Sequence, residues 1–102
     1  MKPTKKSTIG TSFHNDVFNA CVSDLRKILG EPQYEDNSGD DKMNFEWEME
    51  TDNGDVFTIY DWKECRILDE DEILEWHIGG HNKSVTAEAL NEIADALNEL
   101  YK

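Results

Sequence analysis

Residues 43–62, MNFEWEMETDNGDVFTIYDW, contain the strongest structural signal in the chain. Hydrophobic and acidic residues alternate in the first half, which is typical of a β-strand with one buried face. Asn53-Gly54 predicts a tight turn, because both residues tolerate a positive φ. The second half is apolar on both sides, so we expect a strand in the middle of its sheet. Residues 43–52 and 55–62 are therefore predicted to form a β-hairpin.

Shorter patterns on both sides of the hairpin predict two more strands and a helix. Residues 8–14 fit a short strand of small, β-branched and aromatic residues, and residues 73–78 alternate as a second strand should. Residues 85–101 carry an amphipathic stripe at helical spacing, for which Ser84 or Thr86 is the expected cap.

The segment before the hairpin is clear only in part. Residues 22–29 have helical spacing and precede Gly30, which suits the position just past a helix end. Residues 15–21 fit either the start of that helix or a separate strand, and the pattern leaves both open.

These elements predict an α+β fold. We expect a small antiparallel sheet of three to four strands with two helices packed on one face. A single domain is expected over residues 8–102, preceded by a flexible tail at residues 1–7.

The charge of the chain is concentrated in its middle. The formal net charge is −13 over 102 residues. Residues 35–75 contain 16 acidic and three basic residues, whereas the rest of the chain is balanced. Such a surplus disfavours direct binding to nucleic acid or to an anionic membrane and favours a basic partner.

The acidic side of the hairpin is the first candidate binding surface. Carboxylates two residues apart on a strand form a row with a pitch of roughly 7 Å, which is close to the spacing of phosphates along a nucleic-acid strand. Such a row is typical either of a solvated edge or of a surface that imitates DNA and occupies a basic groove. The residues of this candidate surface are Glu46, Glu48, Glu50, Asp52, Asp55 and Asp61.

Aromatic and histidine residues near strand ends form a second candidate. Stacking surfaces together with histidines suit a small nucleotide-like ligand, although such residues are also common in cores. The residues of this alternative pocket are Phe13, His14, Trp62, Trp76, His77 and His81.

Other classes of site have little support. No nucleophile, phosphate-loop or dinucleotide motif is present, so we expect no catalytic activity. The histidine spacing and the sequence DNSGDD match no metal-binding pattern, and we expect no metal or cofactor. Cys21 and Cys65 are expected to be free thiols in a cytoplasmic protein, and no apolar run is long enough to cross a membrane.

Four strings carry a resemblance to known proteins. Together TSFHN, LGEP, NGDVFTIYDWKE and EWHIGG resemble a family of small acidic phage and prophage proteins, over most of residues 8–80. In size and acidity the chain is also similar to phage inhibitors of host defence, including anti-CRISPR and anti-restriction proteins. This resemblance implies action in the cytoplasm of a host cell.

Two functions are therefore expected as alternatives. The first is a phage-type inhibitor that binds a basic host nucleic-acid-binding protein through the acidic side of the hairpin. The second is a non-catalytic protein, with oligomerisation left open, that sequesters a nucleotide-derived immune signal in the aromatic and histidine pocket.

Overall fold

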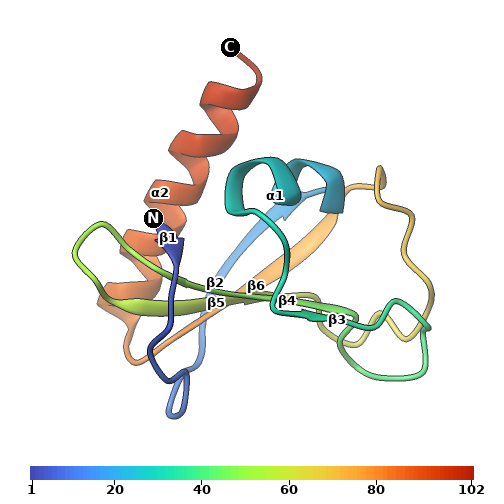
Figure 1. Ribbon diagram of the computed structural model, residues 1–102, viewed down its shortest axis with the longest axis horizontal. Coiled ribbons are helices and arrows are strands. Elements are labelled where there is room, and N and C mark those ends of the chain that lie inside the picture. Colours follow the sequence, from blue (N-terminus) through green and yellow to red (C-terminus); the bar gives the residue numbers. More distant parts are fainter.

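The computed structural model describes residues 1–102 as an antiparallel sheet with two helices on one face (Figure 1). The α+β prediction is confirmed, but the sheet has six strands rather than three to four. In chain order the elements are β1 (Lys2–Pro3), β2 (Ser12–Ala20), α1 (Val22–Leu29), β3 (Tyr34–Glu35), β4 (Phe45–Glu50), β5 (Val56–Tyr60), β6 (Leu74–Gly80) and α2 (Lys83–Leu100).

The sheet is built outward from the predicted hairpin. Its order is β1-β4-β5-β6-β2, and β3 also pairs with β4. As expected, β5 lies between two other strands. The strands missing from the prediction are β1 and β3, which are two residues long each. Two residues are too few to show an alternating pattern.

The hairpin turn differs from the predicted two-residue turn. Thr51 pairs with Asp55, so three residues form the loop, and Gly54 alone among them has a positive φ, of 84°. This loop length sets Glu46 opposite Tyr60 and Trp47 opposite Ile59. A two-residue turn would shift the pairing by one and set acidic side chains opposite apolar ones.

The undecided segment belongs mostly to a strand. β2 runs to Ala20, and α1 begins at Val22 as predicted and ends at Gly30, whose φ is 85°. A bulge interrupts β2 where Asn15 has a φ of 70°. The bulge allows the side chain of Asp16 to reach α2.

The cap of α2 is not one of the two expected residues. Asn82 is the N-cap, and its side chain accepts a hydrogen bond from the Val85 amide at 3.0 Å. Thr86 is buried and bonds to Asp16 at 2.7 Å instead. The helix therefore begins two residues earlier than its apolar stripe.

Two tryptophans fill the core between the sheet and the helices. Trp47 and Trp76 are fully buried and meet edge to face, with ring centroids 5.6 Å apart. Their indole N–H groups donate to the carbonyls of Gly30 and Ala20, at 2.8 and 2.9 Å. These hydrogen bonds remove the penalty of burying a polar group.

The N-terminal segment, expected to be a flexible tail, lies against the sheet. β1 pairs with Met49 and Glu50, and the hydroxyl of Thr4 bonds to Glu50 at 2.7 Å. The ammonium of Lys6 bonds to the Gly54 carbonyl at 2.7 Å. The segment then passes to β2, which forms the opposite edge of the sheet from β1 (Figure 1).

No helix in the structure is both long enough and apolar enough to cross a membrane.

Candidate ligand site on the open face of the sheet

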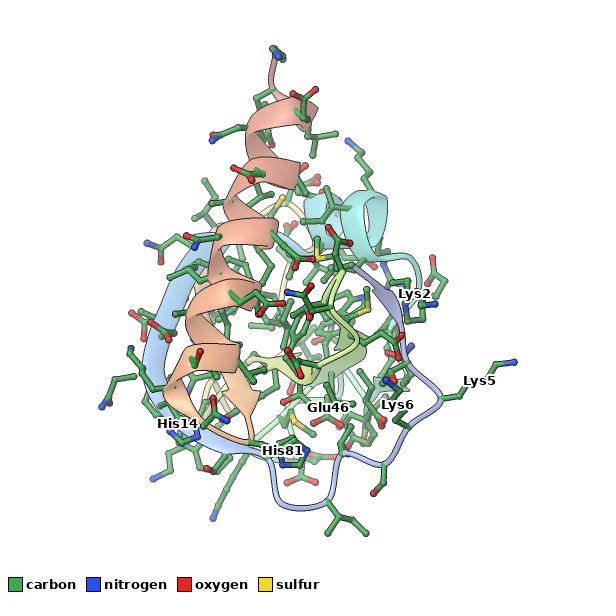
Figure 2. All side chains as sticks on the ribbon, turned by 90° about the vertical axis from the view of Figure 1, so that its left-hand side faces the viewer. Lys2, Lys5, Lys6, His14, Glu46 and His81 are labelled. Carbon is green, nitrogen blue, oxygen red and sulfur yellow. The ribbon has the colours of Figure 1, made fainter.

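No helix covers the face of the sheet opposite α1 and α2, and we call it the open face. Parts of it are bordered by the N-terminal segment and by the loop before β4, from which Thr11 and Met43 line its hollow. Cross-strand pairing places Glu46 and Tyr60 there, beside His77. Figure 2 shows Glu46 below the strands, on the side opposite α1, between Lys6 and His81 in that view. The other strand residues of this face include Phe13, Glu48, Thr58 and Gly79.

A row of aromatic rings crosses the open face. The rings of Phe13 and His77 stack at a centroid distance of 4.2 Å. Tyr60 meets His77 edge to face at 5.6 Å, and Trp62 meets Tyr60 in the same way at 6.2 Å. Phe13 is 38% and Trp62 43% exposed, so both ends of the row are open to a ligand.

A shallow hollow of about 250 Å³ lies beside this row. At about 30 Å³ per water molecule, the hollow has the space of about eight waters, which is enough for a nucleobase. Gly79 and Thr58 pack closely in its lining, since a Cβ on Gly79 would lie only 2.5 Å from the Thr58 hydroxyl. The lining residues are Thr11, Ser12, Met43, Glu46, Thr58, Tyr60, Trp62 and Gly79.

Glu46 is the charged group of the hollow. Partial burial raises the pKa of its carboxyl, and the neighbouring charge of Glu48 raises it further. Burial likewise raises the pKa of the Tyr60 hydroxyl, with the charge of Glu46 as a second cause. No cation lies within 4 Å of the Glu46 carboxylate, so this acceptor is available to a ligand.

Two lysines stand at the Trp62 end of the hollow. The ammonium groups of Lys42 and Lys63 lie 6.0 and 5.6 Å from the centroid of the Trp62 ring. A backbone hydrogen bond of 2.7 Å from Lys63 to Lys42 holds the two chain segments together. Both lysines are exposed, and neither forms an ion pair. The site therefore combines a free carboxylate, aromatic rings and free cations.

The predicted row of carboxylates is interrupted in the structure. Glu46 and Glu48 lie on the open face without cations, but Glu50 is 8% exposed. Glu50 bonds to Thr4 and lies 3.6 and 3.9 Å from the ammonium groups of Lys2 and Lys6. The N-terminal lysines thus neutralise one end of the row.

The other three predicted carboxylates lie away from this row. Asp52 lies in the hairpin loop and Asp55 directly after it, and Asp52 pairs with the terminal amine at 2.6 Å. Asp61 is fully buried and accepts hydrogen bonds from the amides of Asn44 and Phe45. It holds the start of β4 and cannot touch a partner, so the six residues do not form one surface.

The predicted aromatic and histidine set is partly brought together. Phe13, Trp62 and His77 belong to the aromatic row, but Trp76 lies in the core and has no access to a ligand. The remaining two histidines lie at the margin. His14 bonds to the Gly80 carbonyl at 3.1 Å, and the ring of His81 is 3.6 Å from a Cβ placed on Gly10.

Several residues of the site were missed by the sequence analysis. Tyr34 lies in the segment expected to be a polar loop, yet β3 places it opposite Glu46 on the open face. The sequence pattern predicts no ligand role for Lys42 and Lys63, which are two of the three basic residues within residues 35–75. The predicted two-residue turn would place Asp61 opposite Glu46, so the pairing of Glu46 with Tyr60 depends on the three-residue loop of the structure.

The largest hollow of the protein, about 490 Å³, lies elsewhere, between α1, α2 and the end of β2. It is less suited to an anionic or nucleotide ligand, because its charged groups are Asp24 and Asp71. The Tyr101 hydroxyl already donates a hydrogen bond to Asp24. No group of three or more His, Cys, Asp or Glu side chains anywhere is arranged to hold a metal ion.

Comparisons with protein families, curated proteins and solved structures find no match for this chain.

Proposed function

We propose that this protein is a non-catalytic binding protein that sequesters a nucleotide-derived ligand on the open face of its sheet. The proposal is carried by one observation: the aromatic row from Phe13 to Trp62 borders a hollow that contains the free carboxylate of Glu46. Aromatic rings bind bases by stacking, and a carboxylate binds their N–H groups.

A role in counter-defence would follow from such binding. A protein that removes a nucleotide signal from solution needs affinity and abundance but no chemistry. The phage-like strings of the sequence include both NGDVFTIYDWKE, which contains Tyr60 and Trp62, and EWHIGG, which contains His77. The resemblance supports a phage origin, and the position of these residues supports the ligand site.

The direct test is calorimetric titration of the native protein with the common ribonucleoside monophosphates. We expect at least one to bind, and Trp62→Ala to weaken that binding roughly 5- to 150-fold, given about 1–3 kcal/mol for a base stacked on an aromatic ring. Ile67→Ala is the matched control, because Ile67 is an exposed hydrophobic residue outside the hollow. Native protein that binds no nucleotide would disprove the proposal.

A second candidate function is inhibition of a basic host nucleic-acid-binding protein. It is favoured by the two loops at residues 31–44 and 61–73, which together contain eleven acidic and three basic residues. A hydrogen bond between Asn37 and Leu68, of 2.8 Å, joins the loops into one body. Five exposed aspartates in them have no cation within 4 Å, namely Asp36, Asp40, Asp41, Asp69 and Asp71.

This candidate predicts a protein partner whose binding weakens with salt. Immobilised protein would be exposed to a bacterial lysate, and bound proteins would be eluted with duplex DNA. Release of a DNA-binding protein, and its loss when Asp36, Asp40 and Asp41 are changed to Asn, would support inhibition. If that variant still retained the partner, the partner would bind to a surface other than these aspartates.

A further inference from the structure

Glu46 is the one carboxylate of its row that both has no cation within 4 Å and lines the hollow. Glu50, four residues along the same strand, is bonded to Thr4 and lies near two lysines. Glu46 instead lines the hollow and lies between Tyr34 and Tyr60 on neighbouring strands. A partly buried carboxylate usually accepts hydrogen bonds, and Glu46 has no donor in the protein. Two adjacent N–H groups of a ligand would supply these hydrogen bonds.

Lys42 and Lys63 add the opposite charge at the Trp62 end of the same hollow. They are unpaired although the segments that contain them are strongly acidic. Two exposed ammonium groups next to an aromatic ring suit a phosphate attached to a stacked base. A single ligand that satisfies both ends of the hollow therefore has N–H donors at one end and an anionic group at the other.

We propose that the ligand is a guanine nucleotide, held by Glu46 at the Watson–Crick edge of the base and by Lys42 and Lys63 at the phosphate. This inference rests on the proposed function, because it names the ligand of the same site. The ring of Trp62 provides the face on which the purine stacks, and the ring of Tyr60, at 84° to it, borders the edge of the purine.

The choice of guanine follows from the pattern of donors on the four bases. Guanine presents the N1–H and the 2-amino group side by side, and the two oxygens of a carboxylate accept both. Adenine and cytosine each present an amino group next to an unprotonated ring nitrogen, whose lone pair repels a carboxylate. Uracil has one N–H between two carbonyl oxygens. A site built around such hydrogen bonds strongly rejects bases that leave its polar group unpaired.

The first experiment uses the native protein and needs no variant. GMP, IMP, AMP and guanosine are titrated by calorimetry under identical conditions. We expect GMP to bind roughly ten- to a hundredfold more tightly than AMP. IMP, which lacks the 2-amino group, should be intermediate, and guanosine should bind more weakly than GMP because it has no phosphate.

Two kinds of variant then separate the contribution of the base to the binding affinity from that of the phosphate. Glu46→Gln should remove the preference for GMP over AMP, whereas Glu48→Gln should keep it. Glu48 is the matched control because it is on the same strand and face but outside the hollow. Lys42→Gln with Lys63→Gln should reduce GMP to the affinity of guanosine and leave the preference for guanine unchanged.

Each contrary outcome has its own meaning. Equal binding of GMP and AMP to the native protein would overturn the guanine assignment and leave nucleotide sequestration standing. A preference for GMP that survives Glu46→Gln would overturn the role of Glu46. Absence of binding for all four compounds, by a protein with a native circular dichroism spectrum, would overturn the guanine assignment and count against the proposed function.

Discussion

Asp61 shows how a single carboxylate can organise the start of a strand. Its Oδ1 accepts hydrogen bonds from the amides of Asn44 and Phe45, at 2.9 and 2.8 Å. Burial raises the pKa of the Asp61 carboxyl, although these amides stabilise its charged form. One oxygen atom therefore satisfies two buried backbone donors, which would otherwise be left without a partner.

We predict that Asp61→Ala lowers the free energy of unfolding by roughly 2 kcal/mol or more, because both amides lose their acceptor. Asp61→Asn should cost much less, since an amide oxygen at the same position can accept both hydrogen bonds. Urea denaturation of the two variants measures the difference. Equal losses for Asn and Ala would show that the charge, rather than the acceptor, stabilises this corner.

The pKa of Glu46 predicts a dependence of stability on pH. A carboxyl whose pKa is raised on folding stabilises the folded state most when protonated, below the unfolded pKa near 4.3. This contribution is lost as the pH rises through the higher folded pKa. We therefore expect Glu46→Gln to be more stable than the native protein at pH 7, and the difference to shrink toward pH 4. A difference that does not change with pH would contradict the prediction.

The helix α2 depends on a cap that lies outside its apolar stripe. The side chain of Asn82 accepts from the Val85 amide, and Asp16 reaches the same turn through Lys83 and Thr86. Hydrogen bonding to Lys83 lowers the pKa of the Asp16 carboxyl. The bulge in β2 and the first turn of α2 are thus stabilised together.

We predict that Asn82→Ala destabilises the protein by about 1 kcal/mol, as expected for the loss of a capping side chain. Asn91→Ala is the matched control, because Asn91 is an exposed residue within the same helix. It should be neutral or slightly stabilising, since alanine favours helices. Thermal or urea unfolding of both variants measures the effect, and similar values for the two would exclude a capping role.

The whole molecule carries more negative charge than its ion pairs compensate. Arg26 is surrounded by Glu31, Glu35 and Glu70, and Arg66 by Glu64 and Glu72. Each of these clusters holds more acids than bases, so charge repulsion remains in the loops after pairing. Self-repulsion of a net charge of −13 opposes the compact state.

We predict that added salt stabilises this protein. Raising the ionic strength shortens the Debye length from about 30 Å at 0.01 M to about 8 Å at 0.15 M, which screens the repulsion between the loops. The midpoint of thermal unfolding should therefore rise with salt. It can be measured at pH 7 in dilute buffer and in the same buffer with NaCl added to about 0.15 M, which is roughly physiological. A lower midpoint would mean that the attractive pairs around the two arginines outweigh the repulsion.

The amino-acid sequence by itself determined the elements that have a long and regular pattern. The alternation in residues 43–62 indicated the hairpin, and helical spacing indicated α1 at Val22–Leu29 and most of α2. These patterns are reliable because each one records which side of a single element faces the core. The α+β class follows from their number and order.

Only the tertiary structure decided how the site is assembled. The carboxylates looked equivalent in the sequence, yet Glu50 meets the N-terminal segment, Asp61 is buried and Glu46 stays free. Lys63 follows Trp62 in the chain, but Lys42 is brought to Trp62 by a contact between two loops. Such differences arise from packing between distant segments, which no local pattern contains. For the same reason, the sequence placed Trp76 among the candidate ligand residues, whereas packing between distant segments buries it in the core.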